Sequence, residues 1–260
     1  MHRFYLPPAH CQGSTLTIED REAHHGLHVL RLRRGERVVV LDGAGHELLC
    51  ETRGTDRNAI QLDVVQRNFI APLPYQVTLL QAIPKGKVFE TIIQKATELG
   101  VHRIVPLLSE RIVSHLDDES AEAKAAKWRI VAIEASKQCG SAWLPQIDLP
   151  VSPKAFLSRG EKFELPLIAS LQPDNRHPRE LFKTFFAERQ RLPQTVCIWI
   201  GPEGDFSPAE MNAARSAGAL PITLGRLVLR SETAAIYCLS ILNYELQPCD
   251  GAATAGCCGS

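Results

Sequence analysis

The feature that most restricts the fold is the apolar run Val196–Ile200, which is followed at once by the glycine turn that starts at Gly201. A strand with one face in water alternates apolar and polar residues, whereas a parallel strand covered on both faces is apolar throughout. Leu167–Leu171 is a second run of this kind, and Pro221–Leu224 is expected to be a third buried strand. The last hundred residues therefore predict an α/β fold with a parallel sheet.

Helix signals lie between these strands, as a parallel sheet requires. Ser207, Pro208 and Glu210 combine an N-cap serine, a proline at the first helical position and a capping-box glutamate, so we expect a helix from there to about Gly218. The same alternation predicts strands over Val77–Ile83 and Arg103–Leu108, and helices over Val88–Leu99, from Asp117 to about Gln138, and over Glu232–Leu246.

The first seventy or so residues have a different pattern. Short runs such as Arg37–Asp42 and Ile60–Val65 are separated by turn-rich segments, which is typical of a small antiparallel barrel or sandwich. Pro72 and Pro74 mark its end, because proline removes backbone donors from a sheet. We therefore expect a β-domain over residues 1–71, an α/β domain over residues 72–247, and a disordered tail over residues 248–260.

Composition excludes several classes of protein. Lysine plus arginine equal aspartate plus glutamate at 29 each, so any surface that binds nucleic acid must be local. The N-terminus shows no apolar core of a signal peptide and no later segment approaches a membrane span, so we expect a cytoplasmic protein. The eight cysteines show no zinc-ligand spacing, and nothing completes a metal site around His24, His25 and His28, so we expect free thiols and no metal.

Two glycine-bearing turns follow predicted strands, at Gly201–Ser207 and at Gly225–Ala234. Ligands of α/β proteins bind at the carboxyl ends of strands, where glycine lets the backbone approach a small molecule. Either turn alone could equally be an ordinary strand-to-helix connection. Neither is a phosphate-binding loop of known type, which disfavours hydrolysis of nucleoside triphosphates and dinucleotide redox chemistry.

Taken together, the two turns resemble one family closely. Gly201-Pro-Glu-Gly-x-Phe-Ser207 followed by Leu224-Gly-x-x-x-Leu-Arg-x-Glu-Thr-Ala234 is similar to the RsmE-type uridine-N3 methyltransferases of small-subunit (16S) ribosomal RNA, in the SPOUT superfamily. The likeness covers nearly the whole chain. Further segments that match the family's motifs are His25–Arg34, Lys85–Lys87, Gln94–Val101, Ser109–Arg111 and Glu134–Gly140.

The resemblance implies an N-terminal PUA-like β-barrel that helps to hold RNA, a C-terminal SPOUT domain with a deep trefoil knot, and a homodimer. It also implies that backbone loops of the knot bind S-adenosylmethionine, the methyl donor. The chain departs from the family pattern at Asp205, where a second glycine is usual, and at Leu227, where arginine is common. The implied cofactor-binding residues are Leu171, Ile200, Gly201, Gly204, Leu220, Leu224, Gly225 and Leu229.

The chemistry limits which side chains matter. The sulfonium already makes the methyl group electrophilic, whereas N3 of uridine carries a proton that must be lost. Arg230 is our first candidate for stabilising negative charge on the uracil carbonyl oxygens, and Glu203 and Glu232 could accept the proton. Glu232 could instead be an ordinary helix-start carboxylate, and Arg230 could simply pair with such a group.

For RNA contact, the sequence offers a local basic cluster in the predicted barrel and lysines beside the α/β domain. The alternative without a functional role is an ordinary solvent-exposed face, which runs of charged residues usually form. The candidate RNA-binding residues are His25, Arg31, Arg33, Arg34, Lys85 and Lys87.

Two other functions remain open at this point. One is methylation of the ribose 2′-oxygen, the commonest alternative in the superfamily. The other is a non-catalytic RNA-binding factor for ribosome assembly that kept the fold and lost turnover, to which only Asp205 and Leu227 point. Apolar residues of the last predicted helix favour a dimer weakly; they are Ile236, Leu239, Ile241, Leu242 and Leu246.

Overall fold

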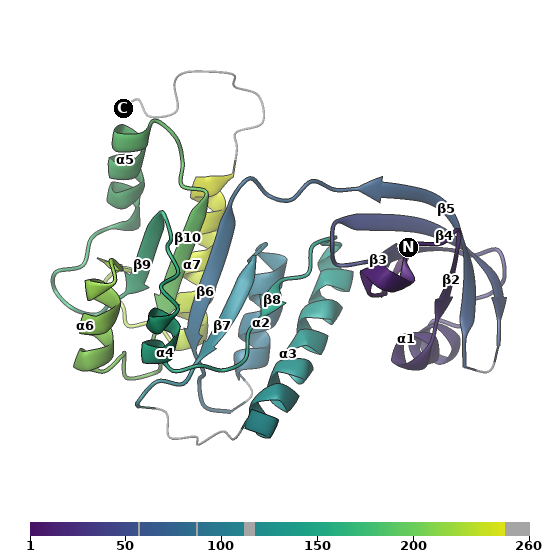
Figure 1. Cartoon of the computed structure of the whole chain (residues 1–260), viewed down its shortest axis with the longest axis horizontal. Helices are drawn as coiled ribbons and strands as arrows, with labels where there is room; N and C mark the ends of the chain where they lie inside the picture. Colours follow the sequence, from purple (N-terminus) through teal and green to yellow (C-terminus); the bar gives the residue numbers. More distant parts are fainter. Residues whose placement is uncertain (57, 87, 112–117, 248–260) are drawn as a thin grey trace.

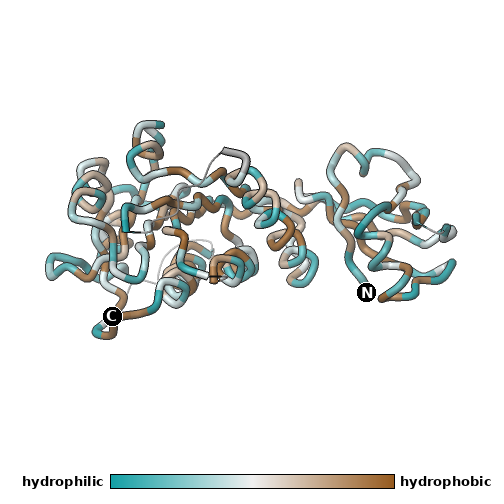
Figure 2. Tube along the Cα trace, turned by 90° about the horizontal axis from the view of Figure 1, so that it is seen from below, coloured by the Kyte–Doolittle hydropathy of each residue, from teal (hydrophilic) through white to brown (hydrophobic). Residues whose placement is uncertain are grey.

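The computed structural model describes residues 1–56, 58–86, 88–111 and 118–247, so the predicted tail lies outside the described residues. Two sheets organise this part of the chain, one from the N-terminal strands β1–β5 and one from the later strands β6–β11 (Figure 1). In a view turned by 90° the two halves form separate lobes joined by a narrow waist (Figure 2). No helix of the described residues is long and apolar enough to cross a membrane.

The N-terminal sheet has the strand order β1-β3-β4-β5-β2. Its strands pair antiparallel except for β1, which pairs parallel to β3, so the prediction of a purely antiparallel unit is wrong for this strand. The parallel pairing joins the first residues of the chain to residues some 35 positions later, a contact that no local pattern reports. The elements are β1 His2–Tyr5, η1 Pro8–His10, β2 Thr15–Ile18, α1 Asp20–His24, η2 His25–Val29, β3 Arg37–Leu41, β4 His46–Thr55 and β5 Ile60–Phe69.

The C-terminal sheet is parallel throughout, with the order β11-β9-β10-β6-β7-β8. This confirms the α/β fold with a parallel sheet, and it places the apolar run around Ile198 at the centre, in β10. The elements are β6 Gln76–Ala82, α2 Val88–Glu98, β7 Arg103–Leu107, α3 Asp118–Cys139, β8 Gln146–Ile147, α4 Pro153–Ser158, β9 Leu165–Ala169, α5 Pro178–Arg189, β10 Thr195–Ile200, α6 Pro208–Ser216, β11 Leu220–Ile222 and α7 Ser231–Leu246.

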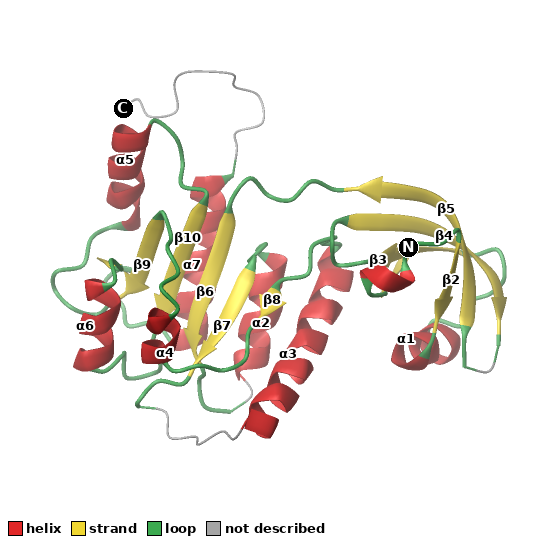
Figure 3. Cartoon of the chain, in the orientation of Figure 1, coloured by secondary structure: helices red, strands yellow, loops and turns green. Residues whose placement is uncertain are grey.

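Helices cover both faces of this sheet (Figure 3). Successive side chains of β10 point to opposite faces, so Ile198 packs with helices α2, α3, α5 and α7, whereas Trp199 packs with α4 and α6. Both side chains are almost fully buried, at 0% and 3% exposed. Burial on two faces is the physical reason that Val196–Ile200, the strand after its first residue, is apolar throughout.

The two sheets are joined through helix α3 and the loop that follows it. Lys137, only 9% exposed, forms an ion pair of 2.7 Å with Glu22 of α1. Arg3 of β1 donates hydrogen bonds to the last carbonyls of α3, those of Lys137 and Gln138. Trp143 donates through its indole nitrogen to the carbonyl oxygen of Ile70. These bonds attach the N-terminal lobe to the α/β lobe at several points.

Candidate active site

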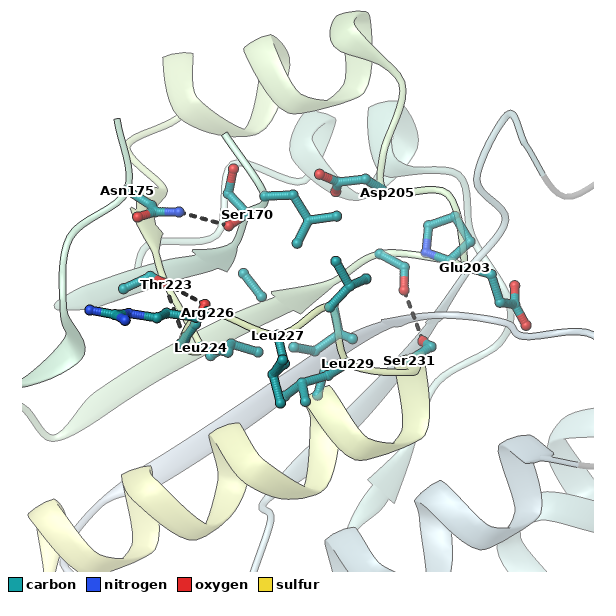
Figure 4. Close-up of a pocket in the computed structure, with 18 residues that line it drawn as sticks. Ser170, Asn175, Glu203, Asp205, Thr223, Leu224, Arg226, Leu227, Leu229 and Ser231 are labelled. Carbon is teal, nitrogen blue, oxygen red and sulfur yellow. Dashed lines mark hydrogen bonds between the residues drawn. The ribbon is translucent and has the colours of Figure 1, made fainter. Parts of the chain in front are cut away.

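A cavity of about 270 Å³ opens at the carboxyl ends of β9, β10 and β11, which are neighbours in the sheet. The loops that leave these strands form its wall, together with the first turns of α7 (Figure 4). We call it the loop cavity. Its lining residues are Ala169, Ser170, Leu171, Asn175, Ile200, Gly201, Pro202, Glu203, Asp205, Thr223, Leu224, Gly225, Arg226, Leu227, Val228, Leu229, Ser231 and Ala234.

A chain of two hydrogen bonds fixes the first glycine turn to helix α7. The hydroxyl of Ser231 donates to the carbonyl oxygen of Gly201 at 2.8 Å, and the side-chain amide of Gln81 donates to that hydroxyl at 2.9 Å. Gln81 is fully buried in β6, next to β10. A polar side chain of the central sheet, that of Gln81, therefore holds the turn after β10 through the Ser231 hydroxyl.

The other two loops carry their own internal bonds. Asn175 donates to the carbonyl oxygen of Ser170 at 3.0 Å, and the amide of Gly225 donates to the hydroxyl of Thr223 at 3.2 Å. Gly225 has φ +108°, a conformation that L side chains rarely adopt, and a side chain there would have open space around it. The need for glycine at this turn is thus set by the backbone and not by crowding.

Helix α6 begins directly after the Gly201–Asp205 turn, and its start is bonded to a distant loop. Glu210 and Ser207 form the predicted capping box. The Glu210 carboxylate also accepts hydrogen bonds from the Ser109 hydroxyl at 3.0 Å and from the amide of Glu110 at 2.9 Å. The guanidinium of Arg111, in the same loop, donates to the carbonyl oxygen of Gly204. The loop after β7 therefore holds the middle of the connection between β10 and α6 and the first turn of α6.

The structure brings most of the expected cofactor-binding residues together around the loop cavity. Two of them do not line it. Gly204 faces a neighbouring cavity, and Leu220 lies in β11 and is 37% exposed. Those that line it are Leu171, Ile200, Gly201, Leu224, Gly225 and Leu229.

Of the three candidate catalytic residues, only Glu203 lines the loop cavity, and its carboxylate points away from the other side chains drawn in Figure 4. Arg230 is the exposed N-cap of α7, and Glu232 follows in the first turn of that helix. Both flank Ser231, which does line the cavity. Arg230 and Glu232 therefore lie beside its lining.

The candidate RNA-binding residues divide between the two lobes. Arg31, Arg33 and Arg34 are exposed in the segment after η2. His25, the first residue of η2, is half-buried. Lys85 is exposed in the loop after β6, whereas Lys87 lies outside the described residues. The cluster around Arg33 is thus in the N-terminal lobe and Lys85 is in the lobe that carries the loop cavity.

Sequence reasoning missed the polar residues that shape the cavity: Gln81, Ser170, Asn175, Thr223 and Ser231. For Gln81 a signal was present, because a glutamine inside an otherwise apolar strand predicts a polar partner in the core. The partner itself, 150 positions away, was not predictable from spacing. Ser170 and Thr223 follow strand ends, where functional side chains gather in α/β folds.

Comparison with known proteins identifies the family. Residues 71–243 match the model of the RNA methyltransferase domain, and residues 18–65 match that of the RNA methyltransferase PUA domain. The chain is 30% identical over 247 residues to ribosomal RNA small subunit methyltransferase E of Synechocystis, covering 95% of this chain and 78% of that protein. It is 29% identical over 239 residues to the Bacillus subtilis protein of the same name, covering 91% and 92%.

Solved structures agree with this assignment. A putative methyltransferase from Legionella pneumophila, in complex with S-adenosylmethionine, has a TM-score of 0.83 and 31% identity, with 93% of this chain and 96% of that chain covered. Ribosomal RNA small subunit methyltransferase E from Neisseria gonorrhoeae, bound to S-adenosylmethionine, has a TM-score of 0.81 and 27% identity, with the same coverage. The chain therefore belongs to the RNA methyltransferase family whose members include ribosomal RNA small subunit methyltransferase E.

Proposed function

We propose that this protein transfers the methyl group of S-adenosylmethionine to N3 of a specific uridine in small-subunit ribosomal RNA. The observation that carries the proposal is the loop cavity, built by three loops at adjacent carboxyl strand ends within the segment that matches the methyltransferase family. This is where parallel α/β folds bind small molecules. The two S-adenosylmethionine complexes named above have the same fold over nearly the whole chain.

The residues of the loop cavity fit S-adenosylmethionine, whose adenosyl group is flat and whose methionyl part is charged. Leu224, Leu229 and Ala234 offer apolar surface on which an adenine ring can pack. Gly201 and Gly225 line the cavity without side chains of their own, so the backbone of these turns can approach the ribose and the amino-acid part closely. When bound, S-adenosylmethionine supplies the electrophilic methyl group.

The protein then has to prepare the uridine. Loss of the N3 proton leaves negative charge on the two flanking carbonyl oxygens, and a fixed cation beside them favours that state. Arg230 is proposed for this role, because it is exposed and adjoins Ser231, which lines the cavity, and because a guanidinium is a cation with a planar fork of donors. Glu203 and Glu232 are proposed as proton acceptors, directly or through water.

RNA contact is proposed for the PUA domain and for the rim of the α/β lobe. The exposed arginines Arg31, Arg33 and Arg34 carry positive charge without a carboxylate partner among the described salt bridges. His25, Lys85 and Lys87 complete the proposed set. Phosphate contacts of this kind fix the register of an RNA and make binding dependent on salt.

Helix α7 and the turn before it supply the argument for a homodimer. Of the residues from which the sequence predicted a dimer, Leu239, Leu242 and Leu246 pack into the protein's own core. The apolar surface that remains outside comes from other residues. They are Leu227, Val228, Tyr237 and Tyr244, which are 78%, 76%, 47% and 78% exposed.

Large exposed apolar side chains on an element that borders a ligand cavity are typical of a subunit interface. The proposal therefore includes a homodimer through this surface, and the deep trefoil knot of the SPOUT superfamily in the loops around the cavity. It further includes the division into domains at residues 1–71 and 72–247, and action on ribosomal RNA in the cytoplasm.

Sedimentation equilibrium of the wild type and of Tyr244→Glu tests the interface, since a charge there should shift the mass toward the monomer.

Nucleoside analysis by mass spectrometry tests the reaction. Small-subunit ribosomal RNA, free or within the assembled subunit, is incubated with the protein and S-adenosylmethionine. We expect 3-methyluridine, with loss of most product in Arg230→Ala. A 2′-O-methyl nucleoside would replace the proposed acceptor with the ribose, and absence of both product and cofactor binding would refute the methyltransferase function.

A further inference from the structure

Asp205 is the one residue of the Gly201–Ser207 turn whose conformation needs a separate explanation. It has φ +65°, in the left-handed region that residues other than glycine adopt uncommonly, asparagine and aspartate more often than the rest. One carboxylate oxygen, Oδ1, accepts a hydrogen bond from the amide of Phe206 at 2.7 Å. The other, Oδ2, is buried and has no hydrogen-bond partner. A charged group in a strained turn is thus left half satisfied.

Such an arrangement is unfavourable for the isolated protein. A buried polar atom without a partner has lost its hydrogen bonds to water and has none within the protein to replace them, and a left-handed backbone adds strain. The start of helix α6, whose N-cap lies two residues later, favours a negative charge at this place. Features of this kind persist where a bound ligand uses them.

Among the residues that the structure describes, no cation forms an ion pair or hydrogen bond with this carboxylate. The guanidinium of Arg111 donates to the backbone oxygens of Gly204 and Asp205 and not to the side chain. Within the described lining of the loop cavity the only cationic side chain is Arg226, and it lies at the opposite side of the cavity in Figure 4. The Asp205 carboxylate extends toward the Ser170 side of the same cavity, so it contributes negative charge to that wall.

We infer that Asp205 is a positioning residue that attracts the sulfonium centre of S-adenosylmethionine, and that it makes the protein prefer the methyl donor over the demethylated product. The inference rests on the proposed function. A sulfonium carries positive charge but has no N–H or O–H, so it interacts with a carboxylate by charge alone and does not need the inaccessible lone pairs of Oδ2. A buried carboxylate oxygen attracts a nearby cation more strongly than one exposed to solvent, because the surrounding dielectric constant is lower.

The inference has a kinetic consequence that separates Asp205 from a proton acceptor. The sulfonium loses its charge as the S–CH₃ bond breaks and the N3–CH₃ bond forms, with the electron pair of the broken bond left on sulfur and the N3 proton released. A nearby carboxylate therefore stabilises the bound donor more than the transition state. Removing it should weaken donor binding without lowering kcat, whereas removing a proton acceptor should lower kcat.

Isothermal titration of S-adenosylmethionine and of S-adenosylhomocysteine into the wild type, Asp205→Asn and Asp205→Gly tests the inference. Both replacements tolerate the left-handed backbone, and asparagine keeps the shape. We expect affinity for S-adenosylmethionine to fall about tenfold and affinity for S-adenosylhomocysteine to change less than about twofold. Asp174→Asn is the matched control, because this carboxylate lies in a neighbouring loop but is already paired with Arg215.

Thermal unfolding without ligand gives a second measurement. Both Asp205 variants should melt at the same temperature as the wild type or higher, since each removes an unsatisfied buried charge. Unchanged binding of S-adenosylmethionine in the variants, equal loss for both ligands, or a fall in kcat at saturating donor would overturn the inference. A wild type that binds neither ligand would instead refute the proposed function.

Discussion

Glu210 offers the sharpest test of how the α6 connection is held. Its carboxylate is 7% exposed and accepts three hydrogen bonds, from the Ser109 hydroxyl, the amide of Glu110 and the amide of Ser207. Glu210→Ala removes the reciprocal half of the capping box, worth about 1 kcal/mol. It also leaves the buried Ser109 hydroxyl and the partly buried amide of Glu110 without an acceptor, at about 1 kcal/mol each. We therefore expect the free energy of unfolding to fall by about 3 kcal/mol.

The chain contains a matched control. Glu180 occupies the same third position of helix α5, also after a proline, but its side chain is 62% exposed. Glu180→Ala should cost less than about 0.5 kcal/mol. Urea unfolding followed by tryptophan fluorescence compares the two. If both variants unfold at the same urea concentration, the bonds from Glu210 to the loop after β7 contribute nothing and the reasoning is wrong.

Further predictions concern the joint between the lobes and the dependence of stability on pH. Gly45→Ala should destabilise more than Gly35→Ala by about 2 kcal/mol in urea unfolding, because both have positive φ but only at Gly45 would a Cβ lie 2.6 Å from the Trp143 ring. Burial opposes ionisation of Asp148, but hydrogen bonds from Arg103 and Arg159 outweigh it and lower the pKa of this carboxyl below 3.8. A lowered pKa contributes stability that is present above the unfolded value and lost as pH falls through the folded one. The free energy of unfolding of the wild type should thus exceed that of Asp148→Asn most at neutral pH, and this difference should shrink below about pH 4. A difference that stays constant down to about pH 2 would contradict this.

Local patterns were sufficient to predict most of the longer elements of the α/β lobe, but not β8, α4 or α5. The apolar run in β10 and the capping box at Ser207 predicted a buried strand and a helix start that the structure confirms. In each case the information lies in residues adjacent along the chain. The resemblance to the methyltransferase family likewise depended on two short segments, and the comparisons confirm it.

Contacts between distant segments were not predictable in this way. The capping box at Glu210 was expected, but its bonds to the loop after β7 join residues 100 positions apart. Gln81 and Ser231 are 150 positions apart, and neither residue type specifies the other. The sequence also directed attention to Glu203, whereas the carboxylate turned toward the cavity is that of Asp205. Which side of a turn a side chain occupies depends on backbone angles that composition does not report.

The attachment of the PUA lobe to helix α3 has a consequence for substrate choice. Lys137 and Glu22 form a nearly buried pair, and Arg3 bonds to the end of the same helix, so the two lobes are fastened on one stiff element. If the arginines near Arg33 hold the RNA, as proposed above, the RNA meets the loop cavity at a separation set by the protein. Under that proposal, only an RNA whose folded shape carries a uridine across that interval is methylated. Selection among the many uridines of a ribosomal RNA can therefore depend on RNA architecture as well as on bases next to the target.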